Sequence, residues 1–411
     1  MRKRYGLGSY TAGAAVARTG DEMSGPALLL AGLAVTGSAA AASSLLAGTM
    51  IAAAVGGPLL GVLLDRSVRP GRMLAAALAG YAVALVVILL SLGRVPIAVT
   101  VLIAVCAGLL GPALSGGWTA QLPRVVAPQD LPRANALDAT TFNLAGLAGP
   151  ALAGAVAHVA GAHTGVVVAA VLICLALPAA RALPAARALP AARGPHRTPA
   201  TSVVADLAAG FRAIVRIRPL ASATTASVIS CAGEGMLVAC APLLGERVLG
   251  GAGQGAMLLS GIAVSAVAAN ALLARSARQP SPDTVILGSC VVLAAACLLA
   301  ATGRPVPLVA AVVLAGIGQG PQLTALFAVR HREAPDRLRG QIFTTGASLK
   351  LSGFAIGAAA AGPLAVTSLP AALLTAAAVQ VLAALSCALL FTRSGPPATA
   401  ESRGARARPA G

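Results

Sequence analysis

Aromatic and acidic side chains are both scarce in this chain of 411 residues. Aromatic residues make up 2% of the sequence, and 12 Asp and Glu residues stand against 30 Lys and Arg residues. The resulting net charge of +18 would suit a nucleic-acid partner, but so few aromatic rings offer no surface on which bases could stack. We therefore expect no nucleic-acid partner, and the positive charge needs another explanation.

Motifs of enzyme and metal chemistry are also missing from the sequence. It contains no His-Glu-x-x-His, no Gly-x-Ser-x-Gly and no phosphate-binding Gly-x-x-x-x-Gly-Lys loop. The seven cysteines form no Cys-x-x-Cys pair and fall in apolar stretches, where they serve as small packing residues. The sequence therefore predicts no metal site and no cofactor. A membrane-embedded enzyme and a non-transporting receptor stay as remote alternatives.

Apolar residues, by contrast, are abundant along the whole length. The chain is 57% hydrophobic and 10% charged, and apolar windows of about twenty residues recur from end to end. A soluble domain could not keep this much apolar surface from water, whereas a bilayer accepts it. The sequence predicts an all-α integral membrane protein. We place twelve helices along the chain. The first begins near residue 9 and the second ends near 64, with a small polar break between them near 37–44. The other ten lie at about 73–92, 97–118, 134–159, 165–178, 220–244, 254–274, 283–302, 305–328, 340–362 and 367–391.

The basic residues sort sharply when these helices are threaded with both termini inside. Arg94, Arg247 and Arg304 fall in outside loops, Arg18 and Lys350 fall within helices, and all the others lie on the cytoplasmic side. This bias is the positive-inside rule, which sets topology. We expect a multi-pass protein of the cell membrane with both termini in the cytoplasm.

A long polar stretch divides the chain near its middle. We predict a six-helix bundle over 1–178, a cytoplasmic linker over 179–218, a second six-helix bundle over 219–392 and a basic tail over 393–411. The linker contains Leu-Pro-Ala-Ala-Arg repeats, which favour a semi-extended chain. Its last part, 206–218, is basic and amphipathic and is expected to lie on the inner leaflet.

The first helix carries three charges near the middle of the membrane. Arg18, Asp21 and Glu22 are three and four residues apart, so either carboxylate lies within reach of the arginine on one helix. A charge held there is expensive and usually faces a wet cavity or a partner. Asp21 and Glu22 are therefore candidates for a proton or cation site, with Arg18 as their partner. The alternative is a structural ion pair.

The second half contains a matching set of polar residues. Glu234 stands in the seventh helix without a basic neighbour on its own turn, which suits a group that loads and releases a proton; the alternative is a neutral glutamic acid bonded to a carbonyl. Lys350 in the eleventh helix either pairs with an acid, binds an anionic substrate or extends toward the inner surface. Three amides are candidates for the cavity wall or, equally, for interhelical hydrogen bonds: Gln319 and Gln322 in this half and Asn143 in the fifth helix of the first half.

Two motifs resemble the major facilitator superfamily. Residues 61–72, Gly-Val-Leu-Leu-Asp-Arg-Ser-Val-Arg-Pro-Gly-Arg, are similar to that family's loop Gly-x-Leu-Ala-Asp-Arg-x-Gly-Arg-Arg, although Val68 stands where the family has its second glycine. The positions that carry the resemblance are Gly61, Asp65, Arg66, Arg69 and Arg72. The resemblance implies that Asp65 meets the cytoplasmic start of the eleventh helix and latches an inner gate, with Arg66 in the same charge network.

The second motif lies on the fifth helix and resembles Gly-x-x-x-Gly-Pro-x-x-Gly of the family's exporters. Here it is carried by Gly146, Gly149, Pro150 and Gly154. The resemblance implies a kinked helix that packs tightly where the two halves meet, and the alternative is generic packing of small residues. Weak echoes between the halves, such as Ala-Pro-Gln-Asp-Leu from 127 and Ala-Pro-Asp-Arg-Leu from 334, fit a duplication of six-helix units.

Together these features indicate a major-facilitator-like fold of two pseudo-symmetric six-helix bundles. The resemblance implies a secondary active transporter that works by alternating access, without ATP. The acidic cluster and the fifth-helix motif favour proton-coupled efflux, by antiport, of a small and partly apolar molecule such as a drug or a secondary metabolite. The alternative is a proton-coupled importer of a small nutrient. The expected partners are this small molecule, protons and the lipid bilayer, and we expect a monomer.

Overall fold

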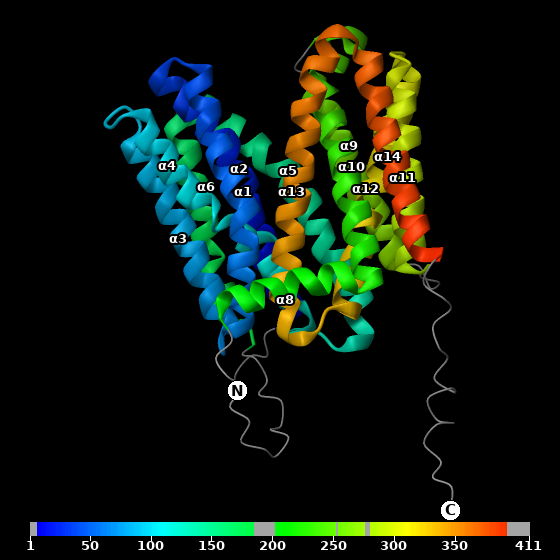
Figure 1. The fold of residues 1–411 in the computed structure, drawn as a ribbon. Helices are drawn as coiled ribbons and strands as arrows, with labels where there is room; N and C mark the ends of the chain where they lie inside the picture. Colours follow the sequence, from blue (N-terminus) through cyan, green and yellow to red (C-terminus); the bar gives the residue numbers. More distant parts are fainter. Residues whose placement is uncertain (1–5, 185–201, 252–253, 276–279, 393–411) are drawn as a thin grey trace, which may run out of the picture.

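The computed structural model describes residues 6–184, 202–251, 254–275 and 280–392. Within them, long helices stand side by side in two bundles (Figure 1). The first bundle contains α1 (Leu7–Thr36), α2 (Ala39–Arg66), α3 (Pro70–Ser91), α4 (Ile97–Gly108), α5 (Leu131–Ala160), α6 (Ala162–Leu175) and α7 (Leu177–Arg181). The second contains α9 (Arg218–Leu249), α10 (Gln254–Arg275), α11 (Pro282–Ala301), α12 (Pro305–Glu333), α13 (Arg339–Thr367) and α14 (Leu369–Thr392).

A short helix, α8 (Val203–Arg216), connects the bundles in sequence and lies across one end of both (Figure 1). We call this the α8 end. Helix α1 begins there, α2 ends there and α13 begins there, so the first half of α13 runs beside the second half of α2. The other end of the bundles is called the opposite end.

Most of these helices have the length and composition of membrane spans. In the described part of the chain, 11 helices are long and apolar enough to cross a bilayer. Helix α1 falls outside that set, although it has 30 residues, because Arg18, Asp21 and Glu22 lie in its middle. It nevertheless packs along α5 and α6 inside the first bundle. The chain is thus a multi-pass membrane protein in which one polar helix is held by its neighbours.

Each bundle has its own hydrophobic core. One buried cluster is confined to the first bundle and runs from Tyr10 to Leu183, and another is confined to the second, from Met236 to Ala377. A smaller cluster spans the two bundles and joins Ala120 and Ala139 to Phe327 and Phe343. Separate cores allow the two bundles to move as rigid units, and α2 with α13 and α5 with α10 pack across the boundary between them.

Several predicted boundaries differ from the structure. The seventh helix ends at Leu249 instead of about 244 and the eleventh at Thr367 instead of about 362. The fourth helix breaks after Gly108 and passes through a wider turn at Ala113–Gly117, because Pro112 cannot donate a backbone hydrogen bond in the middle of a helix. The sixth continues through α7 to Arg181, so the first Leu-Pro-Ala-Ala-Arg repeat is helical and packs on the core instead of being extended. The tenth extends to Glu333, five residues beyond its predicted end.

The second repeat from position 185 onward, the whole third repeat and the predicted basic tail lie outside the described residues.

Candidate functional site

A buried ion pair joins α1 to α5 in the first bundle. The Arg18 guanidinium lies 2.8 Å from a carboxylate oxygen of Asp138, and both side chains are almost completely buried, at 2% and 0% exposure. Thr119 donates a hydrogen bond to the other oxygen at 2.8 Å, and Tyr10 donates one at 3.0 Å. The guanidinium also stacks 3.7 Å from the centre of the Phe142 ring. A carboxylate with this many donors is a fully satisfied anion, as burial in a membrane requires.

The partner of Arg18 is therefore not the one that its spacing predicted. Asp21 and Glu22 follow the arginine by three and four residues, which is the less favourable order for a helical ion pair. Side chains on a helix also lean toward its N-terminus, so the arginine reaches back, away from those acids and toward α5. The sequence analysis did not identify Asp138 as the partner of Arg18.

The two carboxylates of α1 lie at the midpoint of the helix but in different surroundings. Asp21 is half-buried and lies near the Tyr81 hydroxyl on α3, which bonds Ser24 at 2.9 Å. Glu22 is exposed, and its backbone lies against Gly149 of α5. Helices α2, α5 and α6 pack against α1, and they leave the Glu22 side chain exposed beside α5.

Glu234 occupies the corresponding midpoint of α9 in the second bundle. It is half-buried, and Lys350 on α13 is near enough for the two charges to interact. Gln322 of α12, a predicted cavity residue, is buried instead and donates a 3.0 Å hydrogen bond to Ser230. Ser230 in turn donates to Gln380 at 2.7 Å. The structure thus assigns Gln322 to hydrogen bonding between helices.

The other two predicted amides, Gln319 and Asn143, stay candidates for the cavity wall. Gln319 is half-buried on α12. Asn143 is half-buried on α5, and its side-chain nitrogen has no hydrogen-bond partner among the described residues. Burial of an amide nitrogen without a partner is costly, so Asn143 stays a candidate for the cavity wall.

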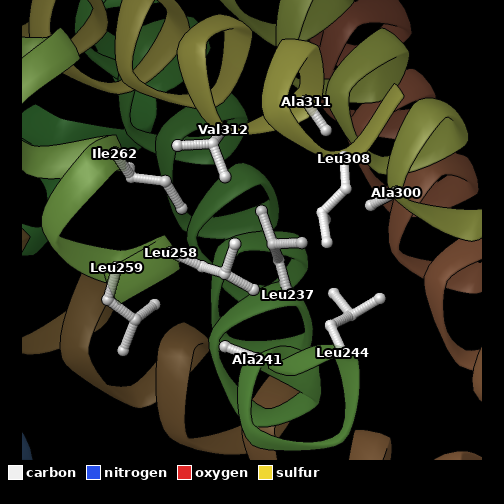
Figure 2. A pocket seen from close by; sticks show the side chains of 10 residues that line it. All are labelled: Leu237, Ala241, Leu244, Leu258, Leu259, Ile262, Ala300, Leu308, Ala311 and Val312. Carbon is white, nitrogen blue, oxygen red and sulfur yellow. The ribbon is translucent and has the colours of Figure 1, made fainter. Parts of the chain in front are cut away.

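One cavity inside the described part of the second bundle is lined by apolar side chains. It holds about 20 Å³ and lies between α9, α10, α11 and α12 (Figure 2). Its lining consists of aliphatic side chains, including Leu237, Leu244 and Ile262, which converge in Figure 2. A space of about one water molecule with no polar lining atoms stays dry. It is a packing void and not a substrate site.

At the α8 end the two bundles are joined by a carboxylate at a helix N-terminus. Asp65, near the end of α2, accepts hydrogen bonds from the backbone N–H groups of Gly340 and Gln341 at 2.7 and 2.8 Å. These are the first N–H groups of α13, where the helix dipole favours a negative charge. Arg339 and Arg124 lie close by, and burial together with the charge of Arg339 lowers the pKa of Arg124.

Other residues of the predicted loop play different parts. Arg66 pairs with Asp206 of α8 at 2.7 Å rather than with α13. Arg69 and Arg72 are exposed. Gly61 lies directly against the backbone of Gln341, so that a side chain at this position would overlap α13. The close approach of α2 to α13 therefore depends on glycine.

A histidine adds a second junction between the bundles that the sequence analysis missed. His331 of α12 is buried and shares hydrogen bonds with the Asn135 side chain at 2.9 Å and the Thr119 carbonyl at 3.2 Å, both in the first bundle. Its ring packs 4.5 Å from that of Phe343. The tenth helix was predicted to end before this residue, so His331 was not expected inside the protein.

Neutralising Asp65 tests whether this contact holds the bundles together. We expect Asp65→Asn to weaken closure by about 1 kcal/mol, or roughly fivefold in the fraction open, because an amide offers no charge to the helix N-terminus. The measurement is the rate at which a polar maleimide labels Ala120→Cys, a buried contact residue, in a background with the exposed Cys106 and Cys174 replaced. The control, Asp130→Asn, changes an exposed carboxylate at the same end and leaves the rate unaltered. Equal rates in both variants would show that Asp65 does not hold the closure.

Comparison with known proteins agrees with this architecture. A family model described as Major Facilitator Superfamily matches residues 10–349. The chain belongs to the major facilitator superfamily. An uncharacterized MFS-type transporter, y4rN of Sinorhizobium fredii (strain NBRC 101917 / NGR234), is 27% identical over 345 residues, covering 83% of this chain and 80% of that relative.

Solved structures show the same fold. A crystal structure of the human organic anion transporter MFSD10 matches with a TM-score of 0.75 at 16% identity, covering 94% of this chain and 100% of that one. A bacterial homologue of the iron transporter ferroportin, in an outward-facing state, matches with a TM-score of 0.75 at 16% identity, covering 94% and 99%. These likenesses establish the major facilitator fold of two helical bundles, as predicted, and no more.

The fifth-helix motif of this major facilitator transporter is used only in part. Gly149 lies against the backbone of Glu22 and Met23 in α1, within the first bundle. Gly146 and Gly154 have open space around the position of a side chain, and Pro150 is exposed. The predicted tight packing between the halves is therefore wrong for these glycines in this conformation, because they face away from their neighbours.

Proposed function

We propose that this major facilitator transporter exports a small, partly apolar molecule in exchange for protons, by alternating access. In this proposal the α8 end faces the cytoplasm, and the structure is the outward-open member of the cycle. The distribution of basic residues supports the orientation. The basic residues near the ends of the spans gather at the α8 end, among them Arg66, Arg124 and Arg339, whereas Arg94, Arg247 and Arg304 lie at the opposite end.

The observation that carries the proton coupling is the contrast between Asp138 and the three midpoint acids. Asp138 is locked to Arg18, whereas no basic group among the described residues lies within ion-pair distance of Asp21, Glu22 or Glu234. These acids occupy the middle of α1 and α9, which are the first helices of the two bundles. Transporters of this class bind substrate and coupling ions at that level of the membrane. A carboxylate that is not held by a cation is free to exchange its proton as the cavity changes sides.

Inverted membrane vesicles test this proposal directly. Vesicles from a host without its own exporters are energised to an acidic lumen, and a panel of antibiotics, dyes and organic acids is added while proton release is followed. We expect at least one compound to evoke release, and we expect that Asp21→Asn, Glu22→Gln or Glu234→Gln lowers it to the level of empty vesicles. The matched control is Glu246→Gln, a carboxylate near the far end of α9.

Two results would change the proposal. If a labelled compound crosses but no compound moves protons, the antiport mechanism is wrong and the acids have a structural role. If the compound and protons move in the same direction, the protein is a proton-coupled importer, which is the second candidate.

A further inference from the structure

Helix α8 bridges the two bundles at their closed end. Near its start, Asp206 pairs with Arg66 of α2 in the first bundle. One residue later, the Leu207 carbonyl accepts a 3.0 Å hydrogen bond from the side chain of Gln341 on α13. Gln341 is also the residue whose backbone N–H holds Asp65 at 2.8 Å. One residue therefore contributes to both the α2–α13 junction and the attachment of α8.

The position of α8 is fixed at the level of the membrane boundary. Its first turn is tied to Arg66, the last residue of the span α2, and its last residue, Arg216, is followed after Ile217 by the start of the span α9. Its 14 residues extend over roughly 21 Å. A helix pinned at both ends to the ends of spans lies in the plane of the bilayer surface.

Only part of the apolar surface of α8 is covered by the protein. Ile214 is buried and packs with Leu220 and Leu338. Three other apolar side chains share an uncovered stripe, with exposures of 73%, 59% and 58% for Val204, Phe211 and Val215. Their spacing of seven and four residues places them in one line along the helix.

Two exposed arginines flank this stripe on the neighbouring face. Arg212 and Arg216 follow Phe211 and Val215 by one residue each, which places them about 100° around the helix from the stripe. An apolar stripe beside a basic face is the pattern of a helix whose apolar side enters the acyl boundary while its cations meet anionic headgroups. The charges thus select a negatively charged surface over a neutral one.

We propose that α8 is a docking surface for anionic phospholipid of the surrounding bilayer, and that lipid bound there holds the α8 end closed. Lipid contact stabilises α8 in the position in which Asp206 forms an ion pair with α2 and the Leu207 carbonyl accepts a hydrogen bond from α13. Loss of that contact releases both attachments and favours opening of the α8 end. This inference does not depend on the transported substrate.

The lipid contact is tested by quenching of a tryptophan at the stripe. Full-length Phe211→Trp protein is reconstituted into vesicles with brominated phosphatidylglycerol or brominated phosphatidylcholine, and the emission of the parent, which has the buried Trp118, is subtracted. We expect stronger quenching by the brominated anionic lipid, and we expect Arg212→Gln with Arg216→Gln to remove that preference. Arg94→Gln, which removes an exposed cation at the opposite end, keeps it. No quenching beyond the parent, or equal quenching by both lipids, would overturn the proposal.

The effect on closure is tested by a distance between spin labels on the two bundles at the α8 end. Labels at Gln129→Cys and Arg337→Cys, both exposed positions, report the closed form as a short distance. We expect the short-distance population to be larger in anionic than in zwitterionic vesicles, and to fall in the double arginine variant but not in Arg94→Gln. The same population in both lipids would contradict the role of lipid in closure, whatever the transport assay shows.

Discussion

Asp138→Asn is expected to destabilise the protein by about 3–5 kcal/mol, the usual effect of removing one partner of a buried ion pair. The substitution preserves the size of the side chain but leaves the Arg18 guanidinium charged, buried at 2% exposure and without a counterion. Inside a bilayer-embedded bundle there is little water to take the place of the carboxylate. The expected result is a large fall in the melting temperature of the purified protein, measured by its monodisperse fraction after heating.

The matched control is the exposed pair at the α8 end. Arg66→Gln breaks a pair whose side chains are 38% and 27% exposed, and we expect it to cost at most about 1 kcal/mol. The combined variant Arg18→Gln with Asp138→Asn removes both buried charges and is expected to recover part of the lost stability. Equal losses in Asp138→Asn and Arg66→Gln would show that the buried pair is not a special feature of the fold.

Gly61→Val is expected to abolish transport while the protein still folds. The branched side chain of valine at this position would overlap the backbone of α13 at Gln341 and push α2 away from it. Because each bundle keeps its own core, the damage falls on the contact between bundles and not on the bundles themselves. The closed α8 end then cannot form, and a transporter restricted to one side of its cycle carries nothing across.

The control for this substitution is Gly154→Val, at a glycine in another spanning helix. There, the position of a side chain has no neighbour within 4 Å, so the same change meets open space. We expect transport by Gly154→Val to be close to that of the parent protein. Loss of melting temperature in Gly61→Val as large as in Asp138→Asn would mean that the glycine supports the fold rather than the gate.

Local sequence patterns were sufficient to predict the helical membrane fold and the contact of Asp65 with the start of α13. Apolar length and the placement of arginines predicted the helical membrane fold, because the bilayer constrains every span in the same way. The resemblance at 61–72 placed Asp65 at the start of α13, and the structure puts two hydrogen bonds there. The midpoint positions of Asp21, Glu22 and Glu234 also follow from span boundaries alone.

The partners of these residues were beyond reach of the sequence, because they lie on other helices. Asp138 is 120 positions from Arg18, and nothing local to either residue indicates the pairing. His331 was missed because a buried helix end with Arg330, His331 and Arg332 has the composition of a solvated terminus. In each case packing between bundles or helices, and not local propensity, decides the environment.

The most direct test of the account is a pair of distances measured on the same protein. Spin labels at Gln129→Cys and Arg337→Cys report the α8 end, and labels at Val159→Cys and Val366→Cys, exposed at 84% and 81%, report the opposite end. We predict a short distance at the α8 end and a long one at the opposite end in the parent, and the reverse in Gly61→Val. Changes at both ends in the same direction, or at neither end, would contradict two bundles that rock about a central site.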